Sequence, residues 1–240
     1  MPDIWVFLVI IFSSLIKGIT GFGFALFSFP LLLIWYSPKE IIPVLMICNL
    51  IASILIVVQK KEHKLLDKNA YFLIEAGGLF TIAGVIALSA STGHLLVKLS
   101  GLFFIALTIY SKFSRRKNSP LPSRHYLFAG AFIGFLTGAV SVSGPPLALF
   151  LNRAKVSNRK FREIFAAFSV VTAVIAIAGY YQTGMISTET LKISLLFTPI
   201  LLTGTIVGKK LNTKMSVSSF QRTNIVLTLI ASLLLIVNPG

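Results

Sequence analysis

The sequence predicts an all-α integral membrane protein made of two inverted four-segment repeats. Each repeat is a broken or re-entrant helical hairpin followed by three transmembrane helices. The mean hydropathy of the chain is +0.88, and hydrophobic residues make up 55% of it while charged residues make up 12%. A soluble domain carries about 25% charged residues, so this composition indicates a chain that lies in the membrane almost throughout.

Eight apolar segments follow one another along the 240 residues. They lie at 4–34, 41–59, 71–91, 94–110, 126–151, 163–181, 191–208 and 220–237. A helix that crosses a bilayer needs about 20 residues. Six of the segments are near this length and are predicted to be plain transmembrane helices, whereas the first and fifth are longer than one crossing requires.

Both long segments contain residues that interrupt a helix. The first holds GITGFGF at 18–24, and the fifth holds GAVSVSGPP at 138–146. Clustered glycines and a Gly-Pro-Pro cannot continue a regular helix without cost. At membrane depth, such broken backbone is tolerated only where it is buried in protein or lines a wet cavity. One break in each half of a chain is typical of a transporter's substrate site.

The two halves of the chain resemble each other at an offset near 120. Segment 71–84 corresponds to 191–204, and each half places a broken segment before three ordinary ones. Chance similarity among apolar helices is the alternative explanation. We divide the chain into a first membrane repeat at 1–111, a basic cytoplasmic linker at 112–124 and a second membrane repeat at 125–240.

The distribution of Lys and Arg predicts the topology. If all eight segments cross fully, the loops on the two sides hold ten and eleven of these residues. If the first and fifth segments are re-entrant, eighteen lie on one side and three on the other, as the positive-inside rule demands. Each half then crosses three times, so the halves are inverted and both termini lie outside. The alternative is a dual-topology protein with eight full spans.

Several classes of function are disfavoured. The net charge of +15 is spread over short loops and forms no basic domain of the kind that binds nucleic acid. The sequence has no HExxH motif, no acidic pair on a helix face and no nucleotide-binding motif, so we expect neither an enzyme nor a cofactor. A metal site is also not expected, because Cys48 is the only cysteine and the three histidines lie in or beside loops.

The two breaks are the first candidate for a substrate site. The half-helix after each break begins with unpaired N–H groups and the positive end of its dipole, which attract an anion. The alternative is close packing of helices through small residues. The predicted substrate-binding residues at the breaks are Thr20, Gly21, Gly23, Ser141, Ser143, Gly144 and Pro145.

Three further polar residues stand in apolar surroundings. Lys17 is next to the first break, where a buried cation is a functional candidate by default; alternatively it snorkels to the interface. Asn49 is predicted to hold the ligand or the hairpin, unless it only joins two helices by a hydrogen bond. Glu75 is a possible proton carrier, with an interfacial position as the alternative.

The same motifs resemble those of the TauE/SafE family of sulfite exporters. GITGFGFA at 18–25 with FPLL at 29–32 is similar to the first repeat of this family. GFLTG at 134–138, GPP at 144–146 and LFL at 149–151 are similar to the second. The resemblance covers nearly the whole chain. It implies an integral protein of the cell inner membrane that moves small sulfur-containing or organic anions.

Together these observations favour a secondary transporter or facilitator of a small anion such as sulfite or a sulfonate. Export by alternating access around the two broken helices is the expected mechanism. Its expected partners are the anionic substrate and the lipid bilayer, with no nucleic acid. The alternatives are a membrane scaffold or accessory subunit without transport, and a carrier for another solute such as a metal cation. The shortage of Asp, Glu and His inside the segments disfavours the cation carrier.

Overall fold

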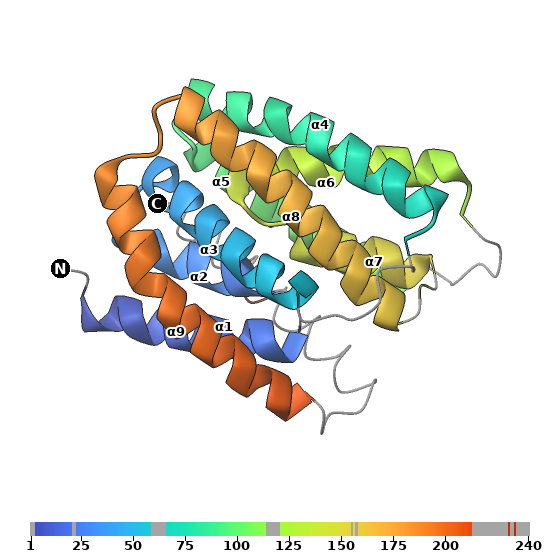
Figure 1. Ribbon diagram of the computed structural model, residues 1–240. Coiled ribbons are helices and arrows are strands. Elements are labelled where there is room, and N and C mark those ends of the chain that lie inside the picture. Colours follow the sequence, from blue (N-terminus) through green and yellow to red (C-terminus); the bar gives the residue numbers. More distant parts are fainter. Residues whose placement is uncertain are drawn as a thin grey trace.

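The computed structural model describes residues 3–20, 23–58, 66–113, 121–154, 156, 158–212, 230 and 233. Within these residues the regular structure is entirely α-helical (Figure 1). The helices are α1 (Ile4–Thr20), α2 (Phe24–Leu32), α3 (Pro38–Val58), α4 (Lys68–Ala90), α5 (His94–Phe113), α6 (Ser123–Val140), α7 (Gly144–Arg153), α8 (Asn158–Gln182) and α9 (Thr188–Asn212). The all-helical fold is thus as predicted.

Both predicted breaks fall between helices. The first long segment is α1 followed by α2, and the fifth is α6 followed by α7. The second, third, fourth, sixth and seventh segments correspond to α3, α4, α5, α8 and α9. The predicted eighth segment, 220–237, lies outside the described residues except at Ile230 and Leu233, and so does most of the predicted linker.

Three helices in the described part of the chain are long and apolar enough to cross a membrane. They are Lys68–Ala90, Glu163–Gln182 and Thr188–Lys210. The stretches Ile4–Ile19 and His94–Phe103 are apolar but shorter.

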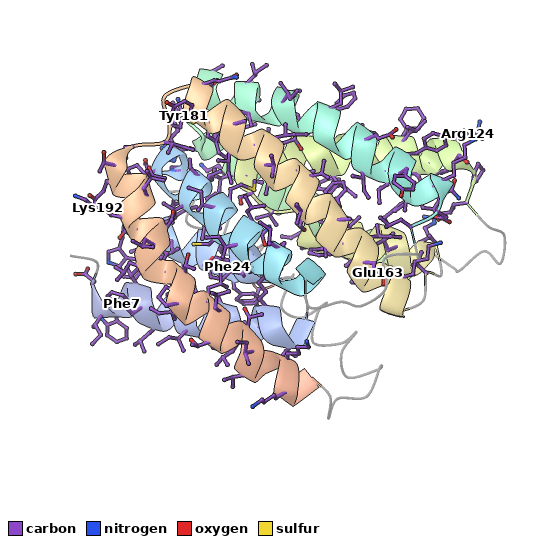
Figure 2. The ribbon with its side chains drawn as sticks, viewed as in Figure 1. Phe7, Phe24, Arg124, Glu163, Tyr181 and Lys192 are labelled. Atoms are coloured by element: carbon purple, nitrogen blue, oxygen red, sulfur yellow. The ribbon has the colours of Figure 1, made fainter. Side chains whose placement is uncertain are left out.

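The helices run in two opposed directions. In Figure 1, α1, α3 and α9 run from left to right, whereas α4, α6 and α8 run from right to left. The short helices α2 and α7 follow the two breaks, and residues next to the breaks, Phe24 and Val142, are buried inside the protein. Figure 2 shows Arg124 and Glu163 at one end of the bundle, and Tyr181 and Lys192 at the other.

Small residues let two helix pairs approach closely. A Cβ atom added to Gly134 of α6 would lie 2.0 Å from the carbonyl oxygen of Gly77 on α4. A Cβ atom added to Gly208 of α9 would lie 2.3 Å from the carbonyl oxygen of Leu15 on α1. Both distances are far below van der Waals contact, so each of these positions requires glycine. The pairs α4–α6 and α1–α9 are therefore held by backbone-to-backbone packing.

The two close pairs use equivalent positions of α1 and α6. The nearest atoms to the added Cβ of Gly208 belong to Leu15, Gly18 and Ile19 of α1. The nearest atoms to the added Cβ of Gly84 belong to Phe135, Gly138 and Ala139 of α6. Each of these α6 residues follows its α1 counterpart by 120 positions, the offset of the predicted sequence repeat, whereas Gly208 follows Gly84 by 124 positions.

Buried apolar side chains form two clusters. The larger cluster contains residues from both hairpin tips, including Phe24 at the start of α2 and Val142 between α6 and α7, together with Met46 of α3. The smaller cluster lies where α4, α6 and α8 begin and includes Leu73, Tyr126 and Phe165. The two hairpin tips therefore share one core, and α3 contributes to it.

Candidate functional site

The first break turns on Gly23. This residue precedes α2 with φ 98° and ψ −18°, a left-handed conformation that favours glycine. Its carbonyl oxygen accepts a hydrogen bond from the N–H of Phe27 at 3.1 Å, so α2 begins inside the protein, where Figure 2 shows Phe24. The first N–H groups of a helix have no partner within it. The start of α2 therefore presents a positive dipole end to the core.

The structure does not fully describe two predicted residues of the first break. Gly21 lies outside the described residues, and for Thr20 the backbone at the end of α1 is described but the side chain is not. Their predicted roles as substrate ligands remain predictions.

The second break turns on Ser141 and not on a glycine. Ser141 follows α6 with φ 59°, and it is the one non-glycine residue of the described chain with a positive φ. Its N–H donates to the carbonyl oxygen of Thr137 at 2.9 Å. Gly144 has no positive φ, so the left-handed residue is Gly23 at the first break and Ser141 at the second.

The start of α7 offers few hydrogen-bond donors. The carbonyl oxygen of Ser143 accepts from the N–H of Leu147 at 3.1 Å. The next residues are Gly144, Pro145 and Pro146, all of them buried. Because proline has no N–H, Gly144 alone carries a donor in the first turn of α7. The two half-helices therefore differ: α2 presents a fuller set of N–H groups than α7 does.

Lys17 lies inside the protein. Its side chain is 1% exposed, and its ammonium donates a hydrogen bond to the amide oxygen of Asn49 on α3. Snorkelling to the interface is therefore ruled out, because that would expose the end of the side chain. Within the described part of the chain no carboxylate forms an ion pair with Lys17. The side-chain nitrogen of Lys17 is therefore bonded to a neutral amide.

Helix α3 connects the two hairpins. One turn before Asn49, the sulfur of Met46 lies 3.8 Å from the hydroxyl of Ser141. Residues three apart on a helix share a face, so Lys17 of the first hairpin and Ser141 of the second reach the same side of α3. Next to Asn49, the thiol of Cys48 donates to the carbonyl oxygen of Ser194 on α9 at 3.8 Å. The structure thus brings Lys17, Asn49 and Ser141 to one region.

Glu75 lies elsewhere. It is exposed on α4, whereas Leu73 and Gly77 face α6. Its predicted role as a proton carrier stays a prediction.

Three buried hydroxyl groups escaped the sequence reasoning. Ser13 on α1, Ser169 on α8 and Thr205 on α9 have side-chain oxygens with no hydrogen-bond partner among the described residues. Buried polar groups are nearly always hydrogen-bonded, so each orphan requires an explanation. One signal was available in the sequence: Ser13 precedes Lys17 by four positions, and the two share a helix face.

An ion pair joins two helices at the end of the bundle that carries Arg124. The ammonium of Lys160 on α8 lies 2.7 Å from Oδ2 of Asp67. The other carboxylate oxygen, Oδ1, accepts from the N–H of Ala70 at 3.1 Å and caps α4. Partial burial alone would raise the pKa of the Asp67 carboxyl. The hydrogen bonds from Lys160 and Ala70 outweigh this and lower that pKa below its ordinary value.

The described residues contain no group of three or more His, Cys, Asp or Glu side chains that could hold a metal ion. A comparison with protein families matches residues 6–235 to the family Sulfite exporter TauE/SafE. No curated protein and no solved structure matches the chain. The family match covers nearly the whole chain, including both breaks.

Proposed function

The chain belongs to the Sulfite exporter TauE/SafE family, and on that premise we propose that it moves a small anion across the cytoplasmic membrane. The proposed substrates are sulfite, a sulfonate or a related organic anion. The chain acts as a secondary transporter or facilitator and uses no cofactor. The substrate site lies where the two hairpin tips meet α3.

One observation carries this proposal. Lys17 is buried beside the first break, and its ammonium is held by the neutral amide of Asn49. A buried charge without a counter-ion is costly, and an anion that arrives at this site supplies the missing charge. A metal cation would be repelled by the same ammonium, so the site favours an anion carrier over a cation carrier.

The backbone at the breaks supports the same substrate. The start of α2 presents N–H groups and the positive end of a helix dipole, an arrangement that binds anions. Gly23 permits the turn, and Thr20, Gly21, Ser141, Ser143, Gly144 and Pro145 complete the proposed lining. The backbone supplies donors without adding charge, while Lys17 provides the attraction.

We propose alternating access of two inverted repeats as the mechanism. The helices α1 and α3 run opposite to α6 and α8, their counterparts in the second half (Figure 1). The close pairs α1–α9 and α4–α6 each join one helix from either half. Secondary transporters with inverted repeats rock one unit against the other around a central site.

Export is the proposed direction. A membrane potential that is negative inside drives an anion outward by about 2.3 kcal/mol per charge per 100 mV, so export needs no coupled ion. The ends that carry most Lys and Arg residues face the cytoplasm in this proposal, and both termini face outward. Reporter fusions at Gly240 and within 112–124 test this orientation; a cytoplasmic Gly240 together with a cytoplasmic 112–124 would contradict it.

Flux measurement tests the function itself. The purified protein is reconstituted in proteoliposomes that are loaded with sulfite or a sulfonate, and efflux is followed with an inside-negative potential. We expect vesicles with the parent protein to release the anion. Vesicles with the same amount of inserted Lys17→Glu protein should not. Equal leakage from empty and protein-containing vesicles would favour the scaffold alternative. Efflux of a divalent metal but of no anion would favour the cation carrier.

A further inference from the structure

We infer that Ser13 and Thr205 are hydrogen-bond donors to the transported anion, and that they complete with Lys17 a site for a singly charged oxyanion. This inference deepens the proposed function and rests on it. Neither residue belongs to a glycine break. Ser13 lies on α1, the helix that carries Lys17. Thr205 lies on α9, which packs against α1 at Gly18, the residue after Lys17.

Ser13 is placed on the Lys17 face of α1. It precedes Lys17 by four residues, so the two side chains lie one above the other on the helix. The side chain of Ser13 is fully buried, and its hydroxyl has no partner among the described residues. The adjacent Ser14 is equally buried but donates to the carbonyl oxygen of Ile11 at 2.7 Å. The neighbouring residues Ser13 and Ser14 therefore differ, because only the hydroxyl of Ser14 forms a hydrogen bond within the described residues.

Thr205 reaches the same region from α9. Its carbonyl oxygen would lie 2.4 Å from a Cβ atom on Gly18, the residue after Lys17. Its side chain is 8% exposed, and its hydroxyl has no partner in the part of the chain that the structure describes. Counted back along α9, Thr205 shares a helical face with Thr198 and Ser194, and Ser194 contacts Cys48 beside Asn49.

The missing bond of Thr205 is unusual for this helix. Ser194 donates to the carbonyl oxygen of Thr190, and Thr198 donates to that of Ser194, each at 2.7 Å. Buried Ser and Thr residues in helices commonly satisfy their hydroxyls in this way. Thr205 does not, so its hydroxyl is available to an external acceptor. A buried hydroxyl that is free to donate, close to a buried lysine, is a feature expected of an anion site.

The charge of the site limits the charge of the ligand. Lys17 has three ammonium donors, and Asn49 accepts from one of them. The remaining ammonium donors and the two hydroxyls match the several acceptor oxygens of a sulfonate or a related oxyanion. One ammonium balances one negative charge. A dianion would leave a second charge buried without a partner, at a high desolvation cost.

Binding measurements on the purified protein test the inference apart from transport. Calorimetric titration at pH 7 uses methanesulfonate as a permanent monoanion and sulfate as a dianion. We expect methanesulfonate to bind at least about tenfold more tightly than sulfate. Ser13→Ala and Thr205→Val should each weaken methanesulfonate binding roughly tenfold, which is the loss of one hydrogen bond to a charged group.

Two matched controls are available on the same helices. Ser14→Ala removes a hydroxyl that is already bonded within α1, and Thr203→Val removes an exposed hydroxyl that donates to the carbonyl oxygen of Pro199 on α9. Both should bind methanesulfonate like the parent. If Ser13→Ala and Thr205→Val also bind methanesulfonate like the parent, the two hydroxyls do not donate to the anion, and the inference is overturned.

The same titrations separate this inference from the proposed function. If the parent exports sulfonate but Ser13→Ala and Thr205→Val bind methanesulfonate as tightly as the parent, the two hydroxyls are not ligands. The transport proposal then still stands. If the parent binds methanesulfonate and the variants bind it weakly, yet no anion crosses the vesicle membrane, the site stands and the transport proposal fails. A parent that neither binds nor transports the anions overturns both.

Discussion

Tyr180 on α8 donates a hydrogen bond of 2.7 Å from its hydroxyl to the carbonyl oxygen of Gly138, in the last turn of α6. The last carbonyl groups of a helix have no partner within it. Tyr180 supplies one from a neighbouring helix and is itself fully buried. The second break is thus stabilised by a side chain that follows it by about forty residues in the chain.

Tyr180→Phe should therefore destabilise the protein. The substitution keeps the ring but leaves the Gly138 carbonyl without its donor, which costs about 1–3 kcal/mol for a buried group. The measurement is the thermal midpoint of the detergent-solubilised protein, which should fall. Tyr181→Phe is the control, because Tyr181 is 74% exposed and its midpoint should not change. Equal midpoints for both variants would show that the bond contributes little.

The positions of the breaks were predictable from sequence, whereas their partners were not. Glycine and proline disrupt a helix locally, so the run 18–24 and the run 138–146 located both hairpins. The hydrogen bond from Lys17 to Asn49 joins residues from different helices, and no local pattern encodes it. For the same reason the orphan hydroxyls of Ser13 and Thr205 could be recognised only after the helices were packed.

The backbone angle at the second break was also beyond the sequence. Composition favours glycine at a positive φ, but the structure places Ser141 there with φ 59°. A left-handed conformation costs a non-glycine residue roughly 1–2 kcal/mol, and the neighbouring helix ends impose it. Nothing in the sequence between α6 and α7 indicates that Ser141, and not Gly144, adopts the positive φ.

The positive-φ residues of the two breaks, Gly23 and Ser141, should respond in opposite ways to substitution. Gly23→Ala introduces a Cβ at φ 98° and should lower stability by about 1 kcal/mol. Ser141→Gly relieves the same strain and should be neutral or stabilising. Chemical denaturation of the two variants in detergent measures the change. A stabilised Gly23→Ala would mean that the turn before α2 tolerates another backbone angle.

Gly134→Ala should disrupt the pairing of α4 with α6. The added methyl group would lie 2.0 Å from the carbonyl oxygen of Gly77, and a backbone atom cannot move aside without separating the helices. We expect a loss of about 1–3 kcal/mol or more, seen as a reduced monodisperse fraction in size-exclusion chromatography. Phe128→Leu is the control on the same helix, since Phe128 is 76% exposed. A normal elution profile for Gly134→Ala would contradict the close approach.

The Asp67–Lys160 pair should stabilise the protein at neutral pH and lose this effect only in acid. The pKa of Asp67 is lowered in the folded protein, so its contribution is complete above the ordinary pKa of about 3.9 and disappears as the pH falls through the lower folded value. Thermal midpoints of the parent and Asp67→Asn should therefore keep a constant difference between about pH 6 and 8.

The size of that difference separates the two roles of Asp67. Asp67→Asn keeps a side-chain oxygen that caps α4 and removes only a partly exposed ion pair, worth about 0.2–1 kcal/mol. Asp67→Ala removes the cap as well and should cost about 1 kcal/mol more. Equal losses in the two variants would mean that the cap contributes nothing.

The charge of Lys17 should govern anion affinity. Lys17→Ala removes the ammonium that Asn49 holds and should weaken apparent affinity by roughly tenfold to a hundredfold, the 1–3 kcal/mol of one charge-assisted contact. Lys17→Glu should be worse, because it sets a negative charge against the anion.

Asn49→Asp is the complementary test: it keeps Lys17 but gives the ammonium an internal counter-ion, and it should reduce affinity as strongly as Lys17→Ala does. Concentration-dependent uptake into proteoliposomes, normalised to inserted protein, measures all three. If Asn49→Asp and Lys17→Glu both transport like the parent, the buried ammonium does not contact the substrate, and the anion is bound by the backbone donors of the breaks alone.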